Sequence, residues 1–299
     1  MTEPDWLKVS TWHGKHELKG NFVRHYTSPS ALIGIVQTGR IWATDARFLN
    51  DYREIAEGIS IVRSVVEAAL QIHKLETLEK LMIALRDRGL SQRIYVASFS
   101  KEDDDLSQWR AYSSGKIGVC LTFFKPHLER IGGSQGFEMA ECIYEFDQKV
   151  EAAEAEVELL VAELEAIEGQ DVGTTADQEA DRCFRRLVRL AASMKSPAFH
   201  AESEWRAIQI DHGGNNPNLE FRATSLGVVP YTMLNLEEDD SSKWTKDPLG
   251  NAVHGKLGIT QYTLYPANIE NALFDSVSSL VWKHNAGGGI KRSSCPHRT

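Results

Sequence analysis

Two long helical stretches, set among short strand-like segments, most constrain the fold of this 299-residue chain. Residues 52–88 carry Ile59, Val62 and Val66 at helical spacing, and residues 147–169 are rich in Ala, Glu, Val and Leu, with a further helix expected over residues 176–194. Helices bunched in two places do not follow the strand–helix alternation of a parallel sheet. We therefore predict one α+β domain over residues 1–299, with a mainly antiparallel sheet and a helical insertion at residues 147–195.

The clearest strand is Arg93–Ser100, RIYVASFS, whose alternate side chains fall on opposite faces. Shorter helices are expected over residues 31–38, 106–112 and 266–273. Further strands are expected near residues 20–27, 41–43, 115–124, 142–146, 204–211, 219–223, 226–231, 257–265, 277–283 and 287–291. No GxGxxG follows a strand and no P-loop is present, which argues against a dinucleotide bound in the Rossmann manner.

The charge balance and the termini limit the possible partners. The formal net charge of −9 argues against broad electrostatic binding to nucleic acid or to anionic membranes. The N-terminal residues show no signal pattern and no apolar run approaches a membrane span, so we expect a cytoplasmic protein with no membrane partner. The four cysteines are scattered without CxxC spacing, which indicates neither a disulfide framework nor a zinc site.

The segment FHAESEWR, residues 199–206, places two carboxylates and an arginine at alternate positions. If residues 200–210 form a strand, Glu202, Glu204 and Arg206 share one face, and the two glutamates stand about 6.5–7 Å apart. One interpretation is an edge strand whose polar face meets water, with Arg206 in a cross-strand ion pair. The other is a pair of acidic groups that act on neighbouring atoms of one ligand, with Arg206 or the ligand compensating their charge.

Three other groups of residues are candidates for a site. Arg24 and Tyr26 point away from His25 on the first strand, and His25 is either a structural histidine or a ligand-binding one. Trp109 and Tyr112 share a helix face, either as core packing or as a platform for a flat ligand. Asn50 and Asp51, followed by Glu54, match a helix cap.

Six blocks follow one another along the chain: HYTS, ATDARFLNDYRE, SFS, LSQWRAYSSGKIGVCLTF, a lysine before FHAESEWR, and a terminal SSCPHR. In this order they resemble the bacterial DUF2971 family, and the resemblance spans roughly residues 21–298. The chain departs from the family pattern at Tyr52, where the family has proline, and at Ala111, where it has histidine. The resemblance implies a setting in phage defence or abortive infection, with an antitoxin or another defence protein as partner.

A more distant resemblance is to ADP-ribosyltransferase-type folds, through the opening HYT strand, the Ser-x-Ser strand and the late Glu-x-Glu. It implies NAD as substrate, with transfer to a protein or nucleic-acid acceptor or hydrolysis, and an ADP-ribosyltransferase-like sheet. The implied catalytic residues are Glu204, which stabilises positive charge on the ribose, Glu202, which orients or deprotonates the acceptor, and His25, which bonds a ribose hydroxyl. The implied nucleotide-binding residues are His25 (or Arg24), Tyr26, Thr27, Ser98, Ser100, Trp109, Tyr112 and Arg206.

Two other functions remain open from the residues themselves. Clustered carboxylates suit hard cations, so Asp51, Glu54, Glu202 and Glu204 are candidates for the Mg²⁺ site of a nuclease. The apolar stripes of residues 52–88 and 147–194 also fit a non-enzymatic sensor or binding module that engages another protein.

Overall fold

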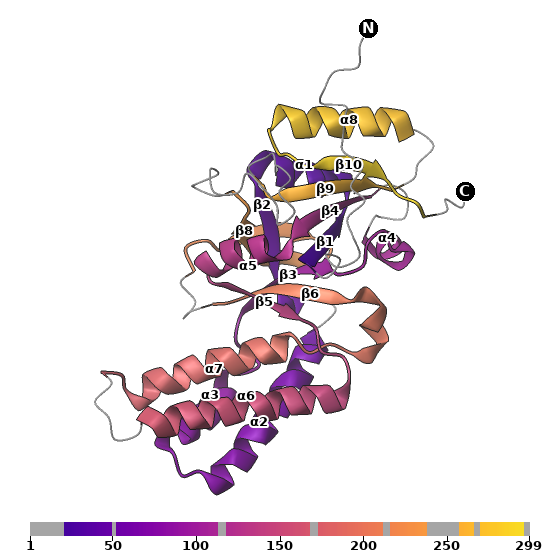
Figure 1. Ribbon diagram of the computed structural model, residues 1–299. Coiled ribbons are helices and arrows are strands. Elements are labelled where there is room, and N and C mark those ends of the chain that lie inside the picture. The colour runs from indigo at the N-terminus through magenta and orange to yellow at the C-terminus, as the bar shows by residue number, and fades with distance from the viewer. Residues whose placement is uncertain are drawn as a thin grey trace.

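The computed structural model describes residues 21–49, 52–112, 118–167, 173–211, 216–237, 257–265 and 270–295. It is a mixed α+β structure in which a twisted sheet lies between a layer of long helices at one end and shorter helices at the other (Figure 1). Within these residues, no helix is long and apolar enough to cross a membrane.

One sheet contains all ten strands of the described chain. The strands are β1 (Phe22–Thr27), β2 (Arg40–Asp45), β3 (Ile94–Ser100), β4 (Val119–Phe124), β5 (Phe137–Glu141), β6 (Glu204–Ile210), β7 (Glu220–Thr224), β8 (Gly227–Asn235), β9 (Ile259–Leu264) and β10 (Gly289–Arg292). Their order is β10-β9-β4-β1-β3-β2-β8-β7, with β6 on β3 and β5 on β6. Only the β9–β10 pair is parallel among these strands, so the predicted antiparallel α+β sheet is confirmed.

The helices pack in two groups. Their bounds are α1 (Pro29–Thr38), α2 (Tyr52–Ile72), α3 (Glu76–Arg88), α4 (Leu106–Tyr112), α5 (Lys125–Ser134), α6 (Phe146–Ile167), α7 (Ala176–Ala192) and α8 (Glu270–Lys283), with 3-10 turns η3 (Ala46–Phe48) and η4 (Pro197–Glu202). Helices α6 and α7, which occupy the predicted insertion, pack against α2 and α3 and share one core with them. Helices α1, α5 and α8 contribute to a second core.

The two cores lie on opposite faces of β3 and β6. Ile94 and Val96 of β3 face the four long helices, whereas Tyr95, Ala97 and Phe99 belong to the core of α1, α5 and α8. This alternation is what the RIYVASFS pattern predicts. The face of β3 that is turned toward the long helices becomes polar at its end, at Ser98 and Ser100.

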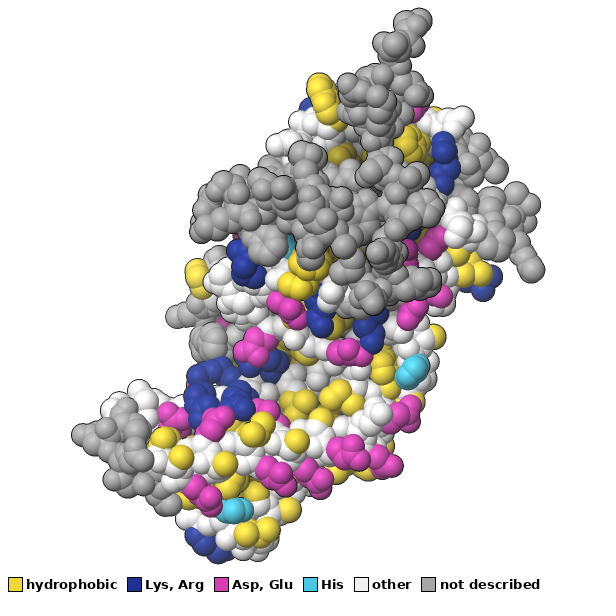
Figure 2. Space-filling view, in the orientation of Figure 1, with side chains coloured by type: hydrophobic (Ala, Val, Ile, Leu, Met, Phe, Trp, Pro, Cys, Tyr) yellow, Lys and Arg dark blue, Asp and Glu magenta, His cyan; other side chains and the backbone are white. Residues whose placement is uncertain are grey.

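Acidic side chains gather over the helical layer, where they are visible in magenta in Figure 2. Arginines of α7 offset part of this charge, since Arg182 and Arg186 both pair with Glu163 of α6 at 2.8–2.9 Å. Exposed pairs of this kind contribute about 0–1 kcal/mol each.

The strand β3 is shared unequally between its neighbours. Strand β6 pairs with all seven residues of β3, from Ile94 to Ser100. The other edge must serve both β1, which meets it only at Ser100, and β2, which meets it at Tyr95 and Val96. The sheet therefore divides at the middle of β3 into one part that contains β1 and another that contains β2. Helix α1 connects β1 to β2.

Three predicted elements were wrong. Residues 200–203 are not strand, because a 3-10 turn runs to Glu202 and Ser203 is left-handed with φ 42°. Residues 277–283 are the second half of α8, whose Val277 and Val281 fall on one helix face. The weak strand expected at residues 142–146 lies earlier, at β5, and α5 was not expected at all.

Two helical glycines give matched tests of this packing. A Cβ added to Gly58 of α2 would stand 2.6 Å from the backbone oxygen of Ala191 in α7, whereas one added to Gly34 of α1 meets nothing within 4 Å. We expect Gly58→Ala to destabilise the protein by about 1–3 kcal/mol, and Gly34→Ala to be neutral or to stabilise it by up to about 1 kcal/mol. Urea unfolding measures both, and equal stabilities would contradict the close α2–α7 contact.

Candidate functional site

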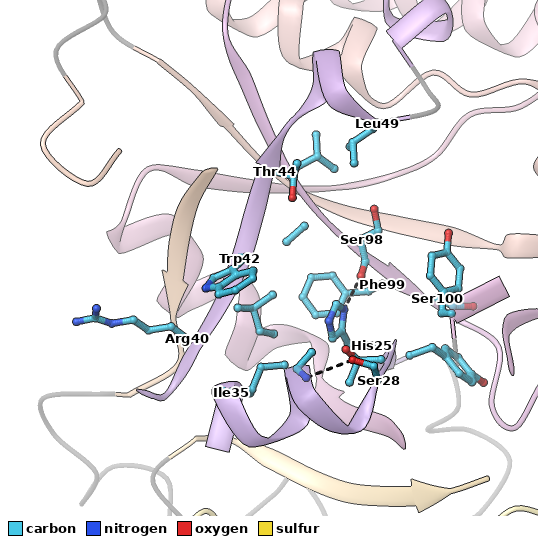
Figure 3. Close-up of a pocket in the computed structure, with 18 of the residues that line it drawn as sticks. His25, Ser28, Ile35, Arg40, Trp42, Thr44, Leu49, Ser98, Phe99 and Ser100 are labelled. Atoms are coloured by element: carbon cyan, nitrogen blue, oxygen red, sulfur yellow. Dashed lines mark hydrogen bonds between the residues drawn. The ribbon is translucent and has the colours of Figure 1, made fainter. Parts of the chain in front are cut away.

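A cavity of about 670 Å³ occupies the place where the sheet divides (Figure 3). One wall is the face of α1 that carries Ser30, Gly34 and Thr38, four residues apart in each case. The floor is β3, and the remaining walls come from β1, β2, α4, η4, the start of β6 and β7. The volume lies within the range of small-molecule sites.

Most of the predicted site residues line this one cavity. They are His25, Tyr26 and Thr27 from β1, Ser98 and Ser100 from β3, Tyr112 from α4, and Glu202 and Glu204 from η4 and β6. Trp109 and Arg206 are not part of its lining. Four segments that are far apart in sequence therefore meet at the division of the sheet.

His25 caps the backbone of β3 where no strand covers it. Its Nδ1 lies 2.9 Å from the carbonyl oxygen of Ser98, and because a carbonyl only accepts, Nδ1 carries the proton. Burial lowers the pKa of His25, although the hydrogen bond to Ser98 opposes this, so the ring is neutral at pH 7. Its Nε2 then presents a lone pair that accepts a hydrogen bond.

Arg24 and Tyr26, the neighbours of His25, form hydrogen bonds with backbone groups of the protein. Arg24, on the other face of β1, donates to the carbonyl oxygens of Phe22 and Lys101. The Tyr26 hydroxyl donates to Glu102 O at 2.9 Å and accepts from Asp105 N at 3.1 Å. Burial raises the pKa of Tyr26, so this hydroxyl stays protonated and occupied.

The two aromatic candidates on α4 have different positions. Trp109 is fully buried beneath Tyr26 in an edge-to-face contact at 4.9 Å, and its Nε1 donates to Asp104. Tyr112 is 44% exposed at the cavity rim, and its hydroxyl donates to Glu202 at 3.5 Å. The structure therefore assigns Trp109 to the core and leaves Tyr112 as the aromatic ring at the cavity.

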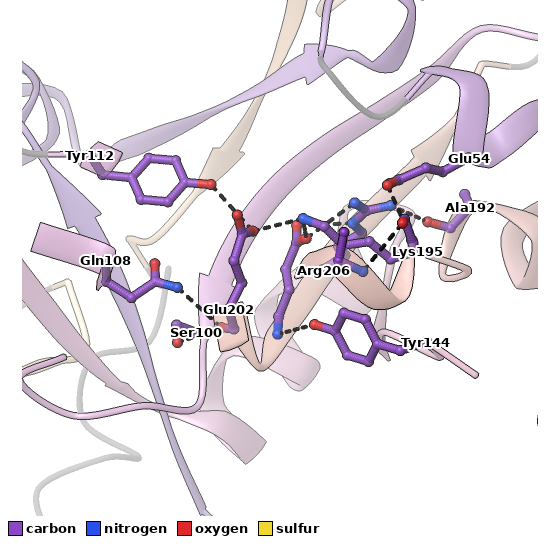
Figure 4. Close-up of polar contacts among 12 residues, drawn as sticks. Glu54, Ser100, Gln108, Tyr112, Tyr144, Ala192, Lys195, Glu202 and Arg206 are labelled. Carbon is purple, nitrogen blue, oxygen red and sulfur yellow. Dashed lines mark hydrogen bonds and ion pairs between the residues drawn. The ribbon is translucent and has the colours of Figure 1, made fainter. Parts of the chain in front are cut away.

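Glu202 and Glu204 do not alternate along one strand, yet both reach the same cation. Glu202 ends η4 and Glu204 begins β6, with the left-handed Ser203 between them. Lys195, which follows α7, places its Nζ 2.7 Å from Glu202 Oε2 and also donates to Glu204 (Figure 4). The ammonium group bridges the two carboxylates.

Glu204 is held as a buried anion. Arg206 donates to it through Nε at 2.9 Å and Nη2 at 3.1 Å, and anchors its own Nη1 on Ala192 O at 2.7 Å. Burial alone would raise the pKa of Glu204, but Arg206 and then Lys195 outweigh it and lower the pKa from 4.5 to about 2. The Glu204 charge is therefore already balanced within the protein.

Glu202 is the carboxylate that the cavity reaches more readily, since its side chain is 22% exposed against 4% for Glu204. Its backbone is fixed by Ser100, whose hydroxyl donates to Glu202 O at 2.8 Å, and by Gln108, which donates to the same oxygen at 3.3 Å. Ser100 therefore positions Glu202 from the floor of the cavity.

The central role of Lys195 was not predicted from the sequence. The lysine stands out there only as part of a family block, and nothing in its local pattern indicates that it is buried between two glutamates. Tyr144 was not predicted either; its hydroxyl accepts from Glu204 N at 2.7 Å and fixes the start of β6.

The candidate metal ligands do not assemble in the described part of the chain. No group of three or more His, Cys, Asp or Glu side chains there is arranged to hold a metal ion. Glu54 accepts a hydrogen bond from Ser196 N at 3.1 Å, and Glu204 is engaged by Lys195 and Arg206. Asn50 and Asp51 lie outside the described residues.

Residues 108–207 match the model of the family described as "Protein of unknown function (DUF2971)". The predicted DUF2971 resemblance is thus confirmed over the segment that carries Tyr112, Lys195, Glu202 and Glu204. His25 and Ser98, on the other side of the cavity, precede the matched residues. Neither curated proteins nor solved structures gave a match.

Substitution of the two glutamates should separate their roles in stability. Glu204→Gln leaves Lys195 and Arg206 as buried cations without their shared anion, so we expect a loss of about 3–5 kcal/mol. Glu202→Gln retains the Glu204 pairs and should cost about 1 kcal/mol. Urea unfolding at pH 7 measures both, and a Glu204→Gln variant as stable as Glu202→Gln would refute the buried ion cluster.

The same cluster predicts an acid dependence. Because the pKa of Glu204 is lower in the folded state, the unfolded state binds more protons between pH 5 and 2, and stability falls as the pH falls through this range. The contribution of Glu204 lost by pH 2 is roughly 3 kcal/mol. The stability difference between the wild type and Glu204→Gln should therefore narrow steadily toward pH 2; a constant difference would contradict the lowered pKa.

Proposed function

We propose that the cavity binds NAD and that the protein cleaves the bond between nicotinamide and ribose, transferring ADP-ribose to an acceptor or to water. One observation carries the proposal. His25, Ser98, Tyr112 and Glu202, which come from separate segments of the chain, line one cavity at the division of the sheet. The cavity also has the size of a small-molecule site.

Glu202, more than Glu204, suits the role of catalytic carboxylate. Cleavage moves the electron pair of the C1′–N bond onto the nicotinamide nitrogen and leaves positive charge on the ribose, which a nearby carboxylate stabilises in the transition state. The charge of Glu204 is balanced by two cations inside the protein, and its side chain is almost inaccessible. Glu202 is the more exposed of the two and touches Tyr112 at the rim.

The attacking hydroxyl or water loses a proton as the new bond to C1′ forms, and the Glu202 carboxylate accepts it. Lys195 and the buried Glu204–Arg206 pair act as positioning residues that hold Glu202 in place.

Of the remaining predicted residues, His25 and Tyr112 bind the substrate. The neutral His25 accepts a hydrogen bond from a ribose hydroxyl at Nε2, since Nδ1 is occupied by Ser98. The Tyr112 ring stacks on the nicotinamide. Tyr26 and Thr27 line the wall without free roles in chemistry, because the Tyr26 hydroxyl is engaged by the backbone.

An ADP-ribosyltransferase-like fold is part of the same proposal. A histidine on the first strand and a glutamate just before a late strand, meeting over a divided sheet, support an ADP-ribosyltransferase-like arrangement. We extend the proposal to a cytoplasmic effector of phage defence or a toxin, with a protein or nucleic acid as acceptor and an antitoxin or defence protein as partner. This extension rests on the DUF2971 resemblance.

Purified protein incubated with NAD, with and without cell extract, tests the chemistry. We expect release of nicotinamide, and Glu202→Gln should slow it by about 10²–10³ because one preorganised charge contributes about 3–4 kcal/mol. Glu158→Gln on the exposed surface of α6 is the matched control and should leave the rate unchanged.

Two results would refute the proposed function. One is no nicotinamide release and no ADP-ribose transfer under any of these conditions. The other is a Glu202→Gln rate equal to that of the wild type while the variant remains folded. Cleavage of RNA or DNA that depends on a divalent cation and stops with a chelator would replace the proposal with the nuclease alternative.

A further inference from the structure

The end of the cavity away from Glu202 is lined by β2 and β7, which both pair with β8, and none of its residues entered the proposed chemistry. Arg40 and Trp42 of β2 and Arg222 of β7 line it. Figure 3 shows Arg40 and Trp42 on the opposite side of the cavity from Ser98 and Ser100. Trp42 is 50% exposed, which is unusual for a tryptophan on a strand whose residues Ile41 and Ala43 to Asp45 are buried.

An aromatic and cationic stack forms this end. The rings of Trp42 and Tyr231 lie 4.9 Å apart with an interplanar angle of 38°. The guanidinium of Arg222 lies 4.9 Å from the centre of the Trp42 ring and 5.6 Å from that of Tyr231. Its Nη2 donates to Thr44 Oγ1 at 2.8 Å, which fixes its orientation. We call Arg40, Trp42, Arg222 and Tyr231 the arginine–tryptophan end.

The charge at this end is not neutralised within the described residues. Neither Arg222 nor Arg40 makes an ion pair with a carboxylate there; the Arg40 guanidinium donates to the sulfur of Met233, at 3.7 Å. Arg222 is half-buried, and burial lowers its pKa, so holding this cation without a counter-charge is unfavourable. A guanidinium fixed at one nitrogen keeps further N–H donors in the geometry that binds phosphate oxygens.

The two ends of the cavity therefore differ in charge. Two arginines lie at one end and the Glu202 carboxylate at the other, with the neutral His25 on the wall. A complementary ligand carries an anionic group beside a flat ring at one end and a centre that becomes positive at the other.

We propose that the arginine–tryptophan end binds the nucleoside diphosphate part of a nucleotide, with phosphate oxygens on Arg222 and Arg40 and the base stacked on Trp42. If the ligand is NAD, the arginine–tryptophan end holds its ADP half. This identification of the whole ligand rests on the proposed function. Binding of ADP itself requires no turnover and is therefore measured independently of the chemistry.

Titration calorimetry of ADP into the full-length protein tests the inference. We expect ADP to bind, more weakly as salt is raised, because the contact is charge-assisted. Arg222→Met replaces the guanidinium with an uncharged, unbranched side chain, and it should weaken ADP binding at least about tenfold. Arg63→Met on the exposed face of α2 is the matched control and should bind ADP as the wild type does.

Two further variants distinguish the parts of the site. Trp42→Leu should weaken ADP but leave inorganic pyrophosphate unaffected, because only the base needs the ring. Arg40→Met should weaken both ligands, and it provides the charge test if Arg222→Met melts at a lower temperature than the wild type. Equal loss of ADP and pyrophosphate in Trp42→Leu would overturn the base-stacking part.

The outcomes separate this inference from the proposed function. ADP binding that depends on Arg222, without any nicotinamide release from NAD, supports the inference and refutes the proposed chemistry. Nicotinamide release with an unchanged KM in Arg222→Met and Arg40→Met, together with no ADP binding at millimolar concentration, overturns the inference and leaves the chemistry standing.

Discussion

The structure depends on how the two edges of β3 are used. Strand β6 pairs with the whole of one edge, and β1 and β2 divide the other, so the middle of β3 has backbone groups without a strand partner. A buried backbone carbonyl needs a hydrogen-bond donor. The imidazole of His25 supplies it at Ser98, and the cavity exists because a side chain, and not a further strand, covers this edge.

The buried ion cluster connects the helical layer to this cavity. Lys195 follows α7, Arg206 bonds the last residue of α7 through Ala192 O, and both hold Glu204 at the start of β6. Removing such charges from water is costly and is tolerated only when the pairing is complete. Lys195 completes the pairing by also donating to Glu202, which fixes that side chain. The same contacts that connect the helices to the sheet therefore present one carboxylate to the cavity.

Local charge, more than net charge, determines what the cavity suits. The chain carries a formal charge of −9, and much of the acidic surface lies on the helical layer. The cavity nonetheless brings Arg40 and Arg222 to one end and Glu202 to the other. Screening confines exposed charges to a range of about 8–10 Å at physiological salt, so a ligand inside the cavity responds mainly to these nearby groups.

The sequence by itself determined the class of fold and most of the elements, although it did not indicate α5 or the second half of α8. The alternation in Arg93–Ser100, the apolar spacing in residues 52–88 and the Ser28–Gly39 capping signals all predicted what formed, because each depends on neighbours within one turn or one strand. The approximate site was also predictable, because the sequence offered His25, Ser98, Tyr112 and the two glutamates as candidates in four separate segments.

Only the tertiary structure decided how those blocks meet. Local pattern placed Glu202 on the strand with Glu204, but the left-handed Ser203 separates them, and Lys195 brings them back to one cation from a different segment. It also placed Trp109 beside Tyr112, although burial beneath Tyr26 takes Trp109 out of the cavity. The reason is physical: burial, pairing of charges and the sharing of a strand edge are properties of contacts between distant segments, which spacing along the chain does not specify.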